Sequence, residues 1–301
     1  MALFRVPQFT DVDVSTGVTL TAGAWDGACG GVLAFTATGT VTVDGALSAD
    51  ALGYSGGIQN NSHNSTGESG ESYAGTGAKS NLNNLGGGGG GGNPGSSCGN
   101  CEGTGGGGGH GDVGEHGDQS NPTVGDGGDG GIAYGDSTFA ALTLGSGGGA
   151  GALDDPTEQG IGGHGGAGGG AVVIRASELV VNGTLSARGE DGEIGCAEFS
   201  DWCGTANSGS SPSEAEPGGG GAGGAVYLIA DTLTAGAGAV LAGGGDGQLS
   251  GSSWQRTSGD GGDGLIRLDF NTLNSLSYGT SAADSEADSV CEPDPGTLGT
   301  P

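Results

Sequence analysis

LGGGGGGGNPGSSCGNCEGTGGGGGH, residues 85–110, decides what kind of fold this chain can form. The stretch contains two uninterrupted glycine runs, Gly86 to Gly92 and Gly105 to Gly109, and almost no side chain that could fill a hydrophobic core. A long glycine run is usually a flexible linker, because glycine loses more backbone freedom on folding than other residues. The alternative is an ordered lattice of extended polyproline II helices, in which chains without Cβ atoms approach to backbone distance. Strand-like sequence on both sides of the stretch favours the lattice.

Composition excludes several classes of protein. The chain has 301 residues, of which 77 are glycine, and a net charge of -29. Glycine at this level without a strict three-residue period excludes collagen and is unusual for a globular domain. The acidic surface repels nucleic acid and anionic lipid, so neither is expected as a partner, whereas calcium would be attracted. No apolar run is long enough to insert into a membrane, and no signal peptide is visible.

A strand-rich stretch recurs along the chain. Residues 30–49 read GGVLAFTATGTVTVDGALSA, and related text returns at 170–187, at 224–242 and, shortened, from Gly264. Each copy has a glycine, an apolar strand that ends in alanine, and a second strand. Because one strand pair cannot bury its apolar face alone, such copies are expected to stack. We therefore predict an all-β fold with a β-solenoid-like spine of repeated strand pairs.

Long glycine-rich insertions separate the copies, at residues 53–131, 189–221 and 243–263. A compact domain seldom carries structureless loops longer than about 12 to 15 residues. Because the insertions leave equivalent points of the repeat, we predict that they are ordered and polyglycine II-like. The chain then divides into one repeat-built domain over residues 1–274, whose first 24 residues form an N-terminal strand segment, and an acidic tail over 275–301.

The six cysteines suggest an oxidised, extracellular protein. An even number of cysteines in a chain poor in core residues is typical of secreted, disulfide-bonded proteins. The predicted pairs are Cys98 with Cys101, Cys196 with Cys203, and Cys29 with Cys291. A zinc site and free thiols remain alternatives, although the two close pairs lie far apart in sequence.

Two sets of residues are candidate metal ligands. Within HGDVGEHGD, the histidines His110 and His116 could hold a transition metal, or the segment could be a solvated polar turn. The candidate calcium ligands are four aspartates in Asp-Gly clusters: Asp126, Asp129, Asp260 and Asp263. The GGxGxD calcium repeat is absent, because Ile132 or Ile266 stands where its aspartate should be. The sequence thus predicts no required cofactor, with bound calcium as the alternative.

No catalytic constellation is evident. Glu190, Asp191 and Glu193 follow a predicted strand, and paired carboxylates serve polysaccharide-acting enzymes. Neither a basic cluster nor many aromatic side chains for sugar stacking accompany them. The glycine runs match dinucleotide-binding patterns only because they match any glycine motif. We expect no enzymatic activity.

Three stretches carry a resemblance to known proteins: WDGACGGVLAFTATGTVTVDGALSADALGYSGG (25–57), IAYGDSTFAALTLGSGGGAG (132–151) and GGGAGGAVYLIADTL (219–233). The chain resembles uncharacterised glycine-rich secreted and surface proteins of deltaproteobacteria and their relatives. The resemblance implies an extracellular structural or adhesive role and supplies no catalytic residues. In architecture alone, the glycine runs are similar to the polyglycine II bundles of an insect antifreeze protein and of some phage tail-tip adhesins. The irregular insertions depart from the antifreeze tripeptide spacing and disfavour ice binding.

The function expected from the sequence is that of an extracellular, non-enzymatic structural protein, a homo-oligomeric subunit of a filament or surface fibre. Residues 2–14 alternate apolar and polar, and they would add as a strand to a neighbouring subunit through Phe4, Val6 and Phe9. In the alternative, this segment caps its own first repeat. Two other functions remain open: an adhesin, including a phage tail tip, that binds cell-surface glycans or other surface ligands, and a polysaccharide-acting enzyme.

Overall fold

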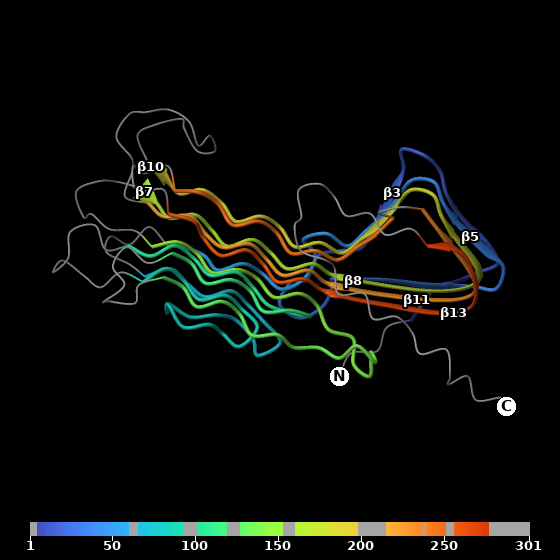
Figure 1. Cartoon of the computed structure of the whole chain (residues 1–301), viewed down its shortest axis with the longest axis horizontal. Coiled ribbons are helices and arrows are strands. Elements are labelled where there is room, and N and C mark those ends of the chain that lie inside the picture. The colour runs from blue at the N-terminus through green and yellow to red at the C-terminus, as the bar shows by residue number, and fades with distance from the viewer. Residues whose placement is uncertain are drawn as a thin grey trace.

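The computed structural model describes residues 5–59, 66–92, 102–118, 127–152, 160–197, 215–236, 239–250 and 256–276. Within these ranges the chain forms strands and extended segments and no helix. Figure 1 shows the longer strands gathered at one end of an elongated molecule and glycine-rich segments running side by side toward the other.

The strands belong to two parallel sheets and one small antiparallel pair. The larger, seven-stranded sheet contains β1 (Gln8–Phe9), β2 (Val12–Val14), β4 (Val32–Ala37), β5 (Thr40–Val43), β8 (Ala171–Val181), β11 (Ala225–Ala235) and β13 (Leu265–Leu276). The second sheet contains β3 (Thr19–Thr21), β6 (Ala46–Ser48), β9 (Thr184–Ser186) and β12 (Val240–Leu241). The antiparallel pair joins β7 (Gly160–Ile161) to β10 (Cys196–Ala197).

The repeat copies lie next to one another with equivalent strands paired, and the register shifts by one residue between β4 and β5 and after Leu233 of β11. One row of Cα partners crosses the whole larger sheet through Val12, Val41, Leu179, Leu233 and Leu273. Because all five side chains are apolar and lie on one face, the row extends the core from strand to strand. The sequence similarity between the copies therefore corresponds to stacking of equivalent residues.

The prediction of a β-solenoid spine is wrong. The described strands form two open parallel sheets, and they do not close into a solenoid. The physical reason is the path of the chain between copies. After β6, β9 and β12 the chain does not return directly to the larger sheet, but continues into long glycine-rich segments. Each copy thus contributes strands to two sheets without completing a coil.

The hydrophobic core contains side chains from both parallel sheets. Val41 and Leu179 of the larger sheet and Leu47 and Leu185 of the second sheet are fully buried and belong to one cluster. Alternate residues of β5 point into this cluster, as the period of a half-buried strand requires. Full burial of one such side chain stabilises the fold by about 1.5 to 3 kcal/mol. This core fixes the strands to which the glycine-rich segments are attached.

We use the name glycine bundle for the extended segments outside the sheets, which are residues 53–59, 66–92, 102–118, 127–132, 145–152, 162–170, 187–195, 215–224, 242–250 and 256–264. Residues 102–110 form its central segment. Their amides donate hydrogen bonds to three neighbouring segments in turn and reach the same segment again three residues later. The pairs are Gly105 and Gly108 to Pro217 and Gly220, Gly106 and Gly109 to Gly89 and Gly86, and Gly107 and His110 to Glu115 and Asp112. A three-residue cycle is the period of a polyproline II helix.

The carbonyl groups of the central segment follow the same cycle toward three further segments. The donors are Ala152 and Gly149 to Gly103 and Gly106, Gly128 and Gly131 to Thr104 and Gly107, and Gly259 and Gly262 to Gly105 and Gly108. The central segment is therefore surrounded by hydrogen-bonded chains on all sides. At the glycine positions such packing leaves no room for a Cβ atom, because a Cβ at Gly107 would lie 1.8 Å from the carbonyl oxygen of Asp260.

Segments at the outside of the bundle place glycine at every third position. In GDVGEHGD, residues 111–118, Gly114 and Gly117 are buried against the central segment, whereas Val113, Glu115 and His116 are exposed. A helix with three residues per turn presents one residue in three to each side. Glycine is needed only on the side that faces another chain, so the glycine period reports how deeply a segment is buried.

Backbone-distance packing predicts a large difference between two glycine substitutions. Gly107→Ala should lower the free energy of unfolding by at least about 1 to 3 kcal/mol, because the added methyl group overpacks the bundle. Gly23→Ala is the matched control, since an added Cβ there meets no atom within 4 Å, and we expect a change below about 1 kcal/mol. Urea denaturation of both variants measures the difference. Equal stabilities would contradict the packing.

Candidate functional site

The residues predicted to bind metal ions do not form one site. No group of three or more metal-ligating side chains lies together in the part of the chain that the structure describes. His110 is fully buried and His116 is exposed. Asp126 lies outside the described residues. Calcium binding therefore stays a prediction that rests on the sequence.

His110 has a structural position where the glycine bundle meets the sheets. Its Nδ1 lies 2.8 Å from the carbonyl oxygen of Gly223, and its Nε2 lies 2.8 Å from the hydroxyl of Thr143. Burial disfavours the charged imidazolium and lowers the pKa of His110 to about 4. The ring is therefore neutral at pH 7, and both of its nitrogens are already engaged within the chain.

The aspartates near residue 260 hold neighbouring segments of the bundle together. Asp260 accepts a hydrogen bond from the amide of Gly247 at 2.6 Å, and Asp263 accepts one from the amide of Gly244 at 3.4 Å. The carboxylates of Glu190 and Asp191 act similarly. Glu190 accepts the amide of Ala167, and Asp191 accepts the amide of Asp246. These four carboxylates accept hydrogen bonds from backbone amides, as carbonyl groups do elsewhere in the bundle.

The predicted disulfides remain untested. Cys29 carries an exposed free thiol. The negative charge of Asp26 beside it raises the pKa of that thiol. Cys98, Cys101, Cys203 and Cys291 lie outside the described residues, and the side chain of Cys196 is not described.

Sequence reasoning missed a buried ionic cluster that joins three segments of the bundle. Arg256 Nη2 lies 2.5 Å from Glu216 Oε1 and 3.5 Å from Glu102 Oε2, and Arg256 Nη1 donates to the Glu102 carbonyl. All three side chains are almost completely buried. A sequence signal exists, because each glutamate stands within two residues of a glycine-rich run. Arginine in this position supplies the positive charge that two buried carboxylates need.

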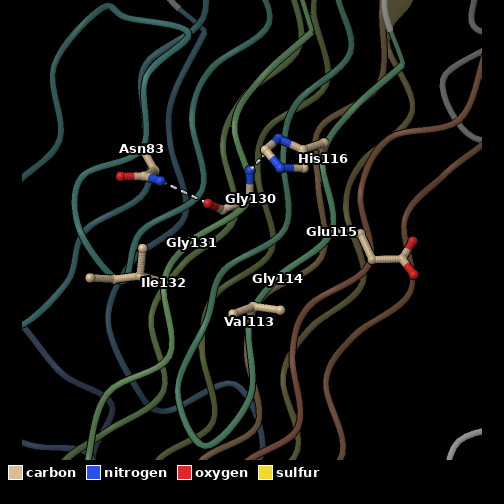
Figure 2. A pocket seen from close by; sticks show the side chains of 8 residues that line it. All are labelled: Asn83, Val113, Gly114, Glu115, His116, Gly130, Gly131 and Ile132. Atoms are coloured by element: carbon tan, nitrogen blue, oxygen red, sulfur yellow. Dashed lines mark hydrogen bonds between the residues drawn. The ribbon is translucent and has the colours of Figure 1, made fainter.

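An open hollow of about 580 Å³ lies on the outer surface of the bundle. Figure 2 shows its lining, in which Val113 and Ile132 provide exposed apolar side chains and Gly130 provides a stretch of backbone. The amide of Gly130 donates to His116 Nδ1 at 3.2 Å, and the Gly130 carbonyl accepts from Asn83 Nδ2 at 2.8 Å. Inside the bundle, neighbouring chains make these bonds. The hollow therefore marks where the array of extended chains ends.

The edges of the larger sheet form a second candidate site. β1 pairs with β4, and β2 pairs with β5, so the described part of the N-terminal segment caps the first repeat of its own chain. Phe4 lies outside the described residues. On the N-terminal edge, the apolar side chains of Val6 and Phe9 remain exposed, and Val18 and Leu20 are exposed at the edge of the second sheet. Phe9 is 47% exposed although its ring packs edge-on against Phe35.

The opposite edge of the larger sheet is β13. Among the described residues, no strand pairs with the side of β13 that faces away from β11. Leu273 of β13 is 41% exposed. The two edges differ in sequence, and both carry apolar surface that a further strand could cover.

The buried neutral state of His110 predicts a pH dependence of stability. Between pH 6.5 and pH 4 the unfolded chain binds a proton at His110 that the folded chain does not, so stability falls as the pH falls through this window. A pKa difference of this size corresponds to about 3 kcal/mol. His110→Gln should therefore lose less stability than the wild type between pH 7 and pH 4. Urea denaturation at both values measures this.

The control for this experiment is His116→Gln, whose imidazole is exposed. It measures how much pH dependence the replacement of an exposed histidine removes, and the His110→Gln result is compared with that amount. If His110→Gln keeps the wild-type pH dependence, His110 is not the group responsible. NMR titration of the His110 ring in the folded wild type provides an independent readout.

Comparisons with protein-family models, with curated proteins and with solved structures found no match. The described residues contain no helix that is long and apolar enough to cross a membrane. Inferences about function therefore depend on the geometry of the chain itself.

Proposed function

We propose that this chain is an extracellular, non-enzymatic structural protein that assembles with copies of itself into a filament or surface fibre. The observation that supports this most is that, among the described residues, both edges of the larger sheet are unpaired, β1–β2 at one side and β13 at the other. An unpaired edge is a template for another strand. Exposed apolar side chains at the N-terminal edge, such as Phe9, add a hydrophobic contribution to such pairing.

The polarity of the sheet favours growth over closed dimers. All pairings in the larger sheet are parallel, so a further copy that continues the sheet must offer its N-terminal edge to β13. A contact between two different surfaces is heterologous, and it produces an open assembly unless the rotation between copies closes a ring. A chain with one edge of each kind can therefore extend at both ends.

The glycine bundle and the charge of the chain fit a structural role outside the cell. The glycine bundle is a long array of extended chains attached to the sheets. It resists bending because its segments are hydrogen-bonded on several sides. The six cysteines and the net charge of -29 agree with an extracellular setting. Carboxylates such as Glu190 and Asp191 bind backbone amides, and this use gives the enzyme hypothesis no support.

Electron microscopy of the purified protein tests the proposal. We expect fibres of uniform width whose length increases with protein concentration, because subunits add at sheet edges. Sedimentation velocity over the same concentrations should show a matching shift to larger species. Isolated particles at every concentration, together with a monomeric sedimentation coefficient, would refute a fibre function.

A second candidate function is that of a binding module for surface ligands such as glycans. The hollow favours it, because Val113 and Ile132 stay exposed beside polar groups of Asn83 and His116. Polar groups in fixed positions with apolar contacts at their side are typical of ligand sites. This function does not require assembly.

Binding to a panel of immobilised polysaccharides tests the second candidate. Ile132→Asp should weaken binding by at least about tenfold, since a charge replaces an apolar contact. Leu249→Asp is the matched control, because Leu249 is an exposed apolar residue that does not line the hollow. Unchanged binding by Ile132→Asp, or no binding by the wild type, would exclude the hollow as a glycan site.

A further inference from the structure

The strand pairing within the larger sheet suggests the register in which a second copy could be added. The sheet's Cα partners form continuous rows from copy to copy, although the first copy has one extra residue between β4 and β5 and the β11–β13 pair shifts register after Leu233. One row runs through Val12, Val41, Leu179, Leu233 and Leu273. A second row of Cα partners runs through Gln8, Thr36, Arg175, Ile229 and Asp269. Both rows begin in the N-terminal segment and end in β13.

We infer that a second copy of this chain adds the outer edge of its β1 and β2 to β13, parallel and in this same register. The inference rests on the proposed fibre function and specifies the interface. In the resulting contact, Val12 of the second copy follows Leu273, and Gln8 of the second copy follows Asp269. The register is the one that stacked repeats use within the chain.

The chemistry of the two ends of each row is complementary. Val12 contacts the core cluster and Leu273 is 41% exposed, so their contact would continue the apolar row and remove Leu273 from water. In the polar row, the Gln8 amide can donate a hydrogen bond to the Asp269 carboxylate. Asp269 already binds Arg267 Nε at 3.0 Å and the Tyr227 hydroxyl at 2.6 Å, which hold its carboxylate in place.

Side-chain alternation limits the register in which the N-terminal edge can pair. Pro7 has no backbone N–H, but its carbonyl accepts the amide of Thr36 in β4, so the missing donor faces the chain's own sheet and the outer edge is unaffected. Between β1 and β2, Asp11 accepts the amide of Thr40 at 2.8 Å, and this interruption separates the two short strands. A one-residue slip would place the apolar residues of the added strand on the solvent side. The side-chain alternation of the added strand therefore restricts the register to shifts of an even number of residues.

The second sheet has the same polarity. Its order runs from β3 to β12, so β3 lies with the N-terminal edge and β12 lies toward β13. Its path contains four strands, whereas the path β1–β4–β8–β11–β13 contains five. A copy added to β13 would therefore make its direct strand pairing through the larger sheet.

Cysteine cross-linking tests the register. Gln8→Cys is placed in one preparation and Asp269→Cys in another, both with Cys29→Ser, and the two are mixed and mildly oxidised. Neighbouring strands lie about 4.8 Å apart, which is within the range that a disulfide can bridge. We expect the linked Gln8–Asp269 peptide pair in mass spectrometry. Asn271→Cys replaces Asp269→Cys as the control, because it lies on the same face two residues out of register.

Equal cross-linking of Gln8→Cys to Asp269→Cys and to Asn271→Cys would overturn the register. Cross-linking of Asp269→Cys mainly to another copy of itself would also overturn it, because that product indicates an antiparallel pair of β13 edges. Leu273→Lys supplies a second readout, because a charge at the edge opposes strand addition. It should raise the concentration needed for fibres at least tenfold. Leu82→Lys is the matched control on the glycine bundle, where Leu82 is exposed.

The outcomes for interface and function are distinguishable. If the wild type and Leu273→Lys form fibres equally well and the Gln8–Asp269 link is missing, this interface is wrong while the fibre function stands. If the wild type forms no fibres and no cross-links, the function itself fails, and the interface with it. Circular dichroism of Leu273→Lys shows whether that variant is folded, and the cross-linking experiment does not depend on it.

Discussion

The structure depends on the approach of polypeptide chains to backbone distance in the glycine bundle. A Cβ added at Gly106 would lie 2.4 Å from the carbonyl oxygen of Asp129, and one at Gly219 would lie 2.2 Å from that of Gly106. Ordering glycine costs about 0.5 to 1 kcal/mol per residue relative to alanine, and a net hydrogen bond offsets this by a similar amount. The bundle therefore has little stability to spare by itself. The sheets supply it, because Gly170, Gly224 and Gly264 lead directly into β8, β11 and β13, so strand spacing sets the spacing of the attached chains.

The same constraint explains the distribution of side chains along the sequence. The central segment needs small residues at nearly every position, since chains bond to it on all sides. An outer segment such as residues 111–118 needs glycine only at one position in three. This local triplet was visible in the sequence, although the chain as a whole shows no strict period. A glycine pattern in this architecture is thus a measure of lattice depth, in the way that an alternating apolar pattern reports a half-buried strand.

The sequence predicted local features better than it predicted neighbours. The alternation in residues 40–43 indicated a half-buried strand, and β5 has the matching burial pattern. The solenoid prediction was wrong because the strand-forming sequences do not specify the path of the chain between copies. In the structure, the chain passes from one copy to the next through the glycine bundle. Arg256, Glu102 and Glu216 show the same limit, since their segments are far apart in sequence and only the lattice brings them together. His110 is a candidate metal ligand in the sequence, but in the fold both of its ring nitrogens are hydrogen-bonded within the chain. Those partners come from distant segments, so the sequence alone does not reveal them.

On the proposed function, the sheet edges add further subunits, whereas the outer segments of the glycine bundle prevent the addition of further chains. The outer segments of the bundle end the array with side chains, and at the hollow His116 and Asn83 take the hydrogen-bonding places of a further chain. Carboxylates such as Asp112, Glu115 and Asp118 recur at the triplet spacing on the exposed sides, and with a net charge of -29 they oppose lateral contact between copies. The described edges of the larger sheet lack such a terminating layer. Charge and side-chain bulk therefore direct association away from the bundle and toward β13 and the N-terminal edge, where main-chain hydrogen bonds outweigh the repulsion only if the strands align.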